Sequence, residues 1–260
     1  VRIPIDDSGV IIDHLNEKAV DVIHTTPSHH FPTGITMPIK RRYDLLGWAV
    51  NNTSSLHNLN SDSIYQYQKK ANNLRYIIED DYDSEFRLSG RPIPSLYSID
   101  TSDCVIYMNT FTKSLASTIR ISYMVLPDHL MDEYNRRLSF YSCPVSTFEQ
   151  LTLSRFISEG YYEKHINRMR TLSRKKRDLI LKTIKDSSLG KISEIREEKS
   201  GLHFILRLDT WMSDQSFIER CRDKGINIST IQKNSFMINY SSIPLERIEE
   251  AIRRIVSVLD

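Results

Sequence analysis

Short apolar runs alternate with amphipathic stretches through the first half of the chain. Four runs have the length and composition of strands: residues 21–26, 74–80, 104–108 and 121–126. Residues 39–49 have the periodicity of a helix. The runs YIIEDD and VIYMNT are apolar on both faces and end in polar residues, which is typical of a covered parallel sheet whose carboxyl ends form a site. This half of the chain is therefore predicted to be an α/β domain.

The pattern becomes helical from Thr147 onward, and Gly160 is predicted to separate two helices. The rest of the chain reads as strand, helix, strand, helix, at residues 202–209, 213–224, 235–241 and 244–259. We therefore predict a large domain over residues 1–146, followed by connecting helices and a small C-terminal α+β domain over residues 147–260. Residues 51–73 are rich in Asn, Ser and Gln, which indicates a surface loop or insertion.

Composition narrows the class of protein. With 40% hydrophobic residues in 260, the chain can bury a core, so it is not a disordered tail. The formal net charge is only +2, and acidic and basic residues are interspersed. The chain therefore has no overall positive field that would attract nucleic acid or an anionic membrane. The apolar runs are too short to span a bilayer, the N-terminus lacks the pattern of a signal peptide, and three widely spaced cysteines suit reduced thiols. We expect a soluble cytoplasmic protein.

The segment VIYMNTFTKSLASTIRISYMVLP carries the first candidate chemistry. It sets Lys113 just past a buried strand among the hydroxyls of Thr110, Thr112 and Ser114, with Arg120 seven positions on. A lysine in this setting can form a Schiff base with an aldehyde, and an arginine can bind a phosphate through two parallel hydrogen bonds. The alternative interpretation of Lys113 is a solvated loop lysine.

The acidic cluster YIIEDDYDSEF ends another predicted buried strand, about 30 residues before Lys113. A buried carboxylate there could bind a pyridinium N–H, and a tyrosine hydroxyl could reach a ring oxygen. Two alternatives remain for Asp80, Asp81 and Asp83, which are a divalent-metal site and a solvated turn.

Two further segments contain candidate residues. TTPSHHFPTG, residues 25–34, has the proline and glycine of a tight strand-to-helix connection. Adjacent histidines such as His29 and His30 are more often surface residues than catalytic groups. The basic run RMRTLSRKKR, residues 168–177, lacks interleaved aromatic residues and is interpreted as the solvated face of a helix rather than a DNA contact.

Five motifs in this order resemble the aminotransferase-like domain of MocR-type members of the GntR regulator superfamily: TPSHHFPTG, YIIEDDYDSEF, GRPIPSL, TFTKSLASTIRISYMVLP and TFEQLTLSRFISEGYYEKHINRMR. The resemblance spans nearly the whole chain. It implies the fold-type-I α/β architecture of pyridoxal 5'-phosphate aminotransferases, with a partial, mostly parallel large domain and a small C-terminal domain. In this resemblance Lys113 forms the internal aldimine, Asp80 pairs with the pyridine nitrogen and Tyr82 faces the ring oxygen. Three residues hold the phosphate: Thr110, Thr112 and Arg120.

The departures from the family pattern are equally informative. We see no counterpart of the family's winged helix-turn-helix domain, or of the first part of its large domain with the helix start that cradles phosphate. Aminotransferases usually have Asn-Pro-Thr-Gly where this chain has Phe31-Pro32-Thr33-Gly34, a change that MocR-type domains share. Met237 stands where aminotransferases usually have the arginine that binds the substrate carboxylate, and the stretch from Asn51 to Lys70 is extra.

Three functions follow from the resemblance. The first is a regulatory domain that binds pyridoxal phosphate and senses a small amino compound. The second is an active transaminase, in which Lys113 moves the proton between substrate and cofactor. The third is an inactive, truncated relic. The missing arginine at Met237 favours the sensor. The resemblance also implies a homodimer for the full-length protein, and DNA binding only through a helix-turn-helix domain that these residues do not contain.

Overall fold

The computed structural model describes residues 1–51, 75–197 and 199–259. The chain forms two compact units. Unit 1 consists of Val1–His30, Ile35–Tyr82 and Pro92–Thr147, and unit 2 consists of Phe31–Gly34, Asp83–Arg91 and Phe148–Asp260. Two short segments of unit 2 therefore interrupt the sequence of unit 1. The predicted insertion at residues 51–73 lies, apart from Asn51, outside the described residues.

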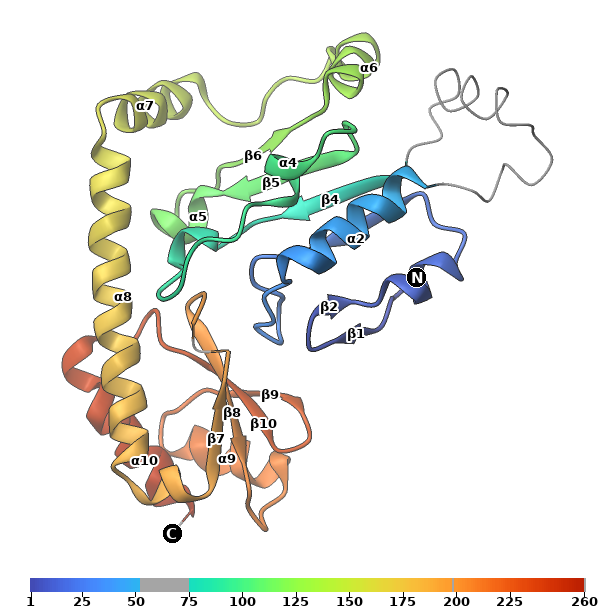
Figure 1. Cartoon of the computed structure of the whole chain (residues 1–260). Helices are drawn as coiled ribbons and strands as arrows, with labels where there is room; N and C mark the ends of the chain where they lie inside the picture. Colours follow the sequence, from blue (N-terminus) through green and yellow to red (C-terminus); the bar gives the residue numbers. More distant parts are fainter. Residues whose placement is uncertain (52–74, 198, 260) are drawn as a thin grey trace. The chain divides into compact units, whose positions relative to one another are not determined.

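Unit 1 is built on a four-stranded sheet with the order β3-β4-β5-β6 (Figure 1). The strands are β3 (Val22–Thr25), β4 (Tyr76–Asp80), β5 (Val105–Thr110) and β6 (Ser122–Val125). The first three strands are parallel, and β6 pairs with β5 in the antiparallel direction. The helices of this unit are α1 (Ile12–Asn16), α2 (Ile39–Val50), α4 (Leu96–Ile99), α5 (Phe111–Ser114) and α6 (Asp128–Leu138), and a small hairpin joins β1 (Ile5–Asp6) to β2 (Gly9–Val10).

Helices α2 and α4 cover one face of this sheet (Figure 1). Ile23, Ile77 and Val105 point from the three parallel strands into a core with apolar residues of both helices, among them Leu45 and Leu96. Burial alternates along β4, as expected for a strand whose side chains point to opposite faces. This alternation divides the polar residues at the end of β4 between a covered face and an open face.

The second face of the sheet is more open among the described residues. Its side chains are half-buried or exposed, and they come from all four strands: Val22, His24, Tyr76, Ile78, Asp80, Ile106, Met108, Thr110, Ser122 and Met124. The sequence predicted strands covered on both faces. That prediction holds for one face within the described part of the chain, because the helices of unit 1 that cover the sheet lie on that side.

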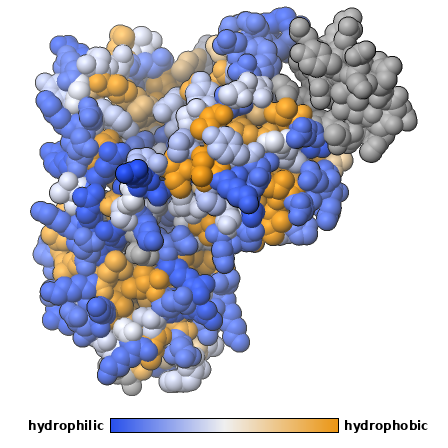
Figure 2. All heavy atoms as spheres, in the orientation of Figure 1, coloured by the Kyte–Doolittle hydropathy of each residue, from blue (hydrophilic) through white to orange (hydrophobic). Residues whose placement is uncertain are grey.

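Unit 2 packs helices against a four-stranded antiparallel sheet of order β7-β8-β10-β9. Its strands are β7 (Ser193–Arg196), β8 (His203–Leu208), β9 (Ser229–Gln232) and β10 (Ser235–Asn239). Its helices are α7 (Thr147–Ser158), which starts at the last residue of unit 1, α8 (Tyr161–Lys185), α9 (Asp214–Asp223) and α10 (Ile248–Leu259), with 3-10 turns at Ser84–Phe86, Ser188–Lys191 and Leu245–Arg247. Phe204, Phe217 and Phe236 are fully buried in its core. Hydrophilic and apolar residues are interspersed on the visible surface of this unit (Figure 2).

The predicted helices and strands are present, with shifts of a few residues at their ends. Gly160 separates α7 from α8 in the left-handed conformation, with φ of 76°, which glycine adopts without steric cost. The strand predicted over residues 104–108 is longer at its end, because Asn109 and Thr110 continue the pairing with β6. This extension brings β5 to within three residues of Lys113.

Candidate functional site

Lys113 lies in α5, a single helical turn that begins where β5 ends. Thr110 caps this turn, since its hydroxyl accepts a hydrogen bond from the backbone N–H of Thr112 at 3.2 Å. Threonine is a favourable N-cap because its side chain satisfies a backbone donor that the helix leaves unpaired. The Lys113 side chain is exposed, whereas the neighbouring Ser114 is buried. The local sequence thus presents the amine at the surface, directly after the carboxyl end of a strand.

Thr110, Thr112 and Arg120 form one polar cluster. The hydroxyl oxygens of the two threonines are 3.0 Å apart, and the Arg120 guanidinium lies 3.5 Å from the Thr112 hydroxyl. The Thr112 hydroxyl donates to the carbonyl of Ile119 at 2.9 Å. The exposed guanidinium still presents further N–H donors. Hydroxyls beside an arginine form a donor set that suits a phosphate, provided that the hydroxyls rotate away from their backbone acceptors.

Asp80 is the last residue of β4 and points to the open face of the sheet. Its carboxylate oxygen Oδ2 lies 3.3 Å from Nε2 of His24, which is on the adjacent strand β3. Asp80 is in register with Met108 on β5, two residues before Thr110, so Asp80 and Thr110 share a face at the carboxyl ends of neighbouring parallel strands. The structure therefore brings a carboxylate and the hydroxyl cluster to the same edge of the sheet.

Asp81 points to the opposite side. It is buried, and one of its oxygens accepts a hydrogen bond from the hydroxyl of Tyr107 at 2.9 Å. Burial, and then the nearby Asp81 charge, raise the pKa of Tyr107 well above its usual value. Because Asp80 and Asp81 face different sides of the sheet, they do not form a joint cation site. Within residues 1–51, 75–197 and 199–259, no three His, Cys, Asp or Glu side chains gather as a metal site requires.

Tyr82 contacts the loop that follows β3. Its hydroxyl donates to the backbone carbonyl of His29 at 3.0 Å and lies 3.3 Å from Nδ1 of the same residue. His29 is buried, whereas the sequence favoured a surface residue. The interpretation as a surface histidine is therefore wrong for His29, because Tyr82 and the loop enclose its ring. His30 is half-buried.

His24 and Arg42 were missed in the sequence. His24 contacts Asp80, but a single histidine in an apolar strand carries no motif that distinguishes it from a surface residue. Arg42 is fully buried, although arginine side chains are mostly solvent-exposed in proteins. Only the placement of the neighbouring strands and loops shows what these two side chains contact.

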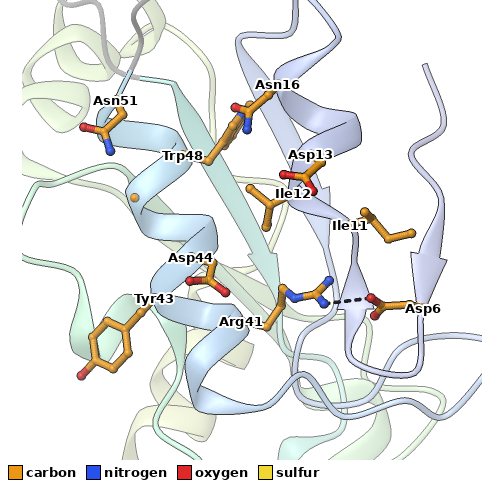
Figure 3. Close-up of a pocket in the computed structure, with 11 residues that line it drawn as sticks. Asp6, Ile11, Ile12, Asp13, Asn16, Arg41, Tyr43, Asp44, Trp48 and Asn51 are labelled. Carbon is orange, nitrogen blue, oxygen red and sulfur yellow. Dashed lines mark hydrogen bonds and ion pairs between the residues drawn. The ribbon is translucent and has the colours of Figure 1, made fainter.

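A separate groove of about 670 Å³ lies between α1, α2 and the N-terminal hairpin (Figure 3). Arg41 extends from α2 toward the hairpin and forms an ion pair with Asp6 at 2.8 Å (Figure 3). Asp13 and Asp44 line the same groove. None of the six residues predicted for the cofactor site is among its lining residues, so the groove is distinct from that site.

The architecture defines the class of protein to which the chain belongs. A mainly parallel sheet with polar residues at its carboxyl ends, followed along the chain by a small antiparallel α+β unit, is shared with solved fold-type-I aminotransferases. The kynurenine aminotransferase of Pyrococcus horikoshii matches with a TM-score of 0.76 and 27% identity, over 100% of this chain and 63% of that chain. The aromatic aminotransferase Aro9 of Candida albicans matches with a TM-score of 0.78 at 18% identity, over 100% of this chain and 63% of that chain, which shows the fold alone.

Sequence similarity identifies the family. The family model described as aminotransferase class I and II matches residues 12–255. The chain belongs to this family. Among curated relatives, the HTH-type transcriptional regulator YdeL of Bacillus subtilis is 41% identical over 88% of this chain and 44% of its own length, and YhdI of the same organism is 38% identical over 96% and 50%. The MocR protein of Rhizobium meliloti, named as a probable rhizopine catabolism regulator, is 28% identical over 99% and 49%. The chain spans about half the length of these regulators.

The recognition of a MocR-type aminotransferase-like domain is therefore confirmed, as is the fold class. None of the helices in the described part of the chain is both long and apolar enough to cross a membrane. The family model describes class I and II aminotransferases, which implies pyridoxal phosphate as the group to test against the residues of this site.

Proposed function

We propose that the chain is the effector-sensing domain of a MocR-type regulator, and that it binds pyridoxal 5'-phosphate through Lys113. The observation that carries the proposal is the shared location of three kinds of side chain. The Asp80 carboxylate, the Thr110–Thr112–Arg120 cluster and the Lys113 amine all lie at or after the carboxyl ends of two adjacent parallel strands. Ligands of α/β proteins bind at these strand ends.

The donor set fits the chemical groups of this cofactor. Arg120 and the two threonine hydroxyls suit the phosphate, the Lys113 amine suits the aldehyde, and the Asp80 carboxylate suits a protonated ring nitrogen. The bound cofactor supplies an electrophilic carbon and a ring that withdraws electrons from it. Asp80 would keep the ring nitrogen protonated, and the Tyr82 hydroxyl would orient the ring through its oxygen.

Sensing rather than turnover is favoured by Met237, the residue at which the resemblance expects an arginine. Met237 lies in β10, where it is paired with Ile205 and Ser229 and is partly buried. Losing a bidentate contact to the substrate carboxylate removes both affinity and the alignment that turnover requires. Recognition of an amino compound would still be available to the site, because it would depend on Lys113 and little on carboxylate positioning.

The wider assignments rest on the relatives. We propose a homodimer for the full-length protein and DNA binding through a separate helix-turn-helix domain. Along the chain we propose a large domain over residues 1–146, interrupted by the two short segments Phe31–Gly34 and Asp83–Arg91 of unit 2, and connecting helices with a small domain over residues 147–260. The HTH-type regulators that match the chain, over about half of their length, support the assignment of DNA binding to a separate domain.

The test is a visible absorbance spectrum of the protein with added pyridoxal phosphate, followed by borohydride reduction and peptide mapping. We expect an absorbance band and a covalent link at Lys113. Lys113→Ala should lack both, whereas the matched variant Lys164→Ala, in helix α8 of unit 2, should retain them. A label on another lysine would refute the assignment of Lys113.

Sensing and turnover are separated by a panel of amino compounds. A sensor should show spectral shifts with little or no keto acid formed. Sustained keto-acid formation at ordinary enzyme rates, on the order of 1 per second or faster, would instead identify a transaminase.

A further inference from the structure

Arg42 and Glu79 form a fully buried ion pair in unit 1, with 3.5 Å between Nη1 of Arg42 and Oε1 of Glu79. Arg42 lies in the first turn of α2, and Glu79 is the residue of β4 just before Asp80. Burial raises the pKa of Glu79 above its usual value, and two backbone hydrogen bonds together with Arg42 oppose this effect. Burying two charges costs free energy unless each charge has further hydrogen-bond partners. The other partners of Arg42 and Glu79 therefore indicate the role of this buried pair.

Arg42 directs its three nitrogens to three backbone carbonyls. Nε donates to Met37 at 3.1 Å, Nη2 to Pro27 at 3.0 Å and Nη1 to Pro94 at 3.0 Å. Pro27 and Met37 are also joined to each other, since the Pro27 carbonyl accepts from the Met37 N–H at 2.8 Å. Arg42 therefore fixes both ends of the loop that carries His29.

Glu79 secures a different segment. Its two oxygens accept hydrogen bonds from the backbone N–H groups of Leu96 and Tyr97, at 2.8 and 2.9 Å. These donors belong to the first turn of α4, which has no earlier carbonyls within the helix to accept them. The pair thus joins three sites within unit 1: the two ends of the loop, at Pro27 and Met37, the end of β4, and the start of α4.

We infer that Arg42 and Glu79 are positioning residues of the proposed cofactor site, acting through Tyr82. The Tyr82 hydroxyl is held by the carbonyl and ring of His29, on the loop that Arg42 fixes. Glu79 holds β4 from the covered face while Asp80, the next residue, points to the open face. Because the Tyr82 oxygen is held in place by His29, the Tyr82 O–H can rotate toward a ring oxygen of the cofactor while the Tyr82 oxygen stays where it is. This inference rests on the proposed function, because it concerns the residues that would contact the cofactor.

Hydrogen exchange tests the pair without any cofactor. Arg42→Lys keeps the charge but cannot reach three separate carbonyls, whereas Arg41→Lys changes the adjacent arginine, which binds Asp6 and the Val10 carbonyl instead (Figure 3). We expect faster amide exchange in residues 26–38 and 92–98 for Arg42→Lys only, with β8 and β10 unchanged. Equally faster exchange throughout α2 and β3 to β5 would show a general core residue and overturn the inference.

A second measurement tests the link to Tyr82 in the protein loaded with pyridoxal phosphate. The pH midpoint of the visible absorbance change should shift by about one unit in Tyr82→Phe and in Arg42→Lys, the size expected when one hydrogen bond to a titrating group is lost. The double variant should match Tyr82→Phe, because Arg42 acts through that hydroxyl. Additive shifts would overturn the inference. No absorbance band in the unchanged protein would count against the proposed function, and the exchange experiment would still decide whether Arg42 fixes the ends of the loop and the start of α4.

Discussion

Replacing Asp80 by Asn tests which carboxylate of the acidic cluster contacts the cofactor. The change preserves shape and removes one charge on the open face of the sheet, where Asp80 lies 3.3 Å from the His24 ring. A hydrogen bond to a charged group contributes about 1.5–3 kcal/mol. The Asp80 side chain is 31% exposed, and solvent screening favours the lower part of that range, about 1.5–2 kcal/mol. Since 1.4 kcal/mol is tenfold in affinity, the Kd for pyridoxal phosphate should rise about 10- to 30-fold.

Asp81→Asn is the matched control, because it removes the same charge from the next residue. Asp81 faces the covered side, where it accepts a hydrogen bond from Tyr107, so its loss should lower the unfolding midpoint and leave cofactor affinity close to that of the unchanged protein. Titration with pyridoxal phosphate, followed by visible absorbance, measures the affinity, and thermal unfolding measures the stability. Unchanged affinity in Asp80→Asn together with lost binding in Asp81→Asn would refute the assignment of the two faces.

Three further predictions concern pH, thiol reactivity and stability. Burial lowers the pKa of His30 below its usual value of 6.5. The stability that neutral His30 contributes is therefore complete above pH 6.5 and is lost as the pH falls through the lowered pKa of the folded protein. In a plot of unfolding midpoint against pH, His30→Asn should flatten the decrease below pH 6.5. Burial raises the pKa of Cys104 to about 12 and that of Cys221 to about 11, whereas Cys143 is exposed. Iodoacetamide at about pH 8 should therefore label Cys143 first, and peptide mapping would show the order of labelling. Phe236 is fully buried, and Phe236→Ala should lower the free energy of unfolding by about 3–5 kcal/mol in urea denaturation; a loss below about 1 kcal/mol would contradict its place in the core.

Strong periodic patterns were sufficient to predict most of the architecture. The sequence identified β4 and β5 from their apolar runs, and α8 from its long amphipathic repeat. It did not identify β7 and β9, since SEIR and STIQ are short and partly polar, and their pairing depends on β8 and β10. Such strands form because a neighbouring edge is available, which local sequence does not encode.

The candidate site shows the same difference between local and long-range information. Thr110, Thr112 and Arg120 were found because they are close in sequence, and the structure brings them into contact. The contact of His24 with Asp80 joins strands that are far apart along the chain, so no spacing rule indicated it. Asp80 and Asp81 point in opposite directions because of the register of β4. Consecutive acidic residues in the sequence do not determine that register.

The interleaving of the two units also constrains how the protein can be made and divided. Leu88, from the early segment Asp83–Arg91, is buried in the core of unit 2, and its N–H donates to the carbonyl of Lys199, more than a hundred residues later. As the chain leaves the ribosome, this core therefore cannot form until β8 and β10 have been synthesised, whereas all of unit 1 has been made by Thr147. A protease cut at that point would separate Leu88 from its partners, so neither fragment would carry a complete set of contacts for unit 2. The second unit is consequently not a module that a single genetic exchange could transfer intact.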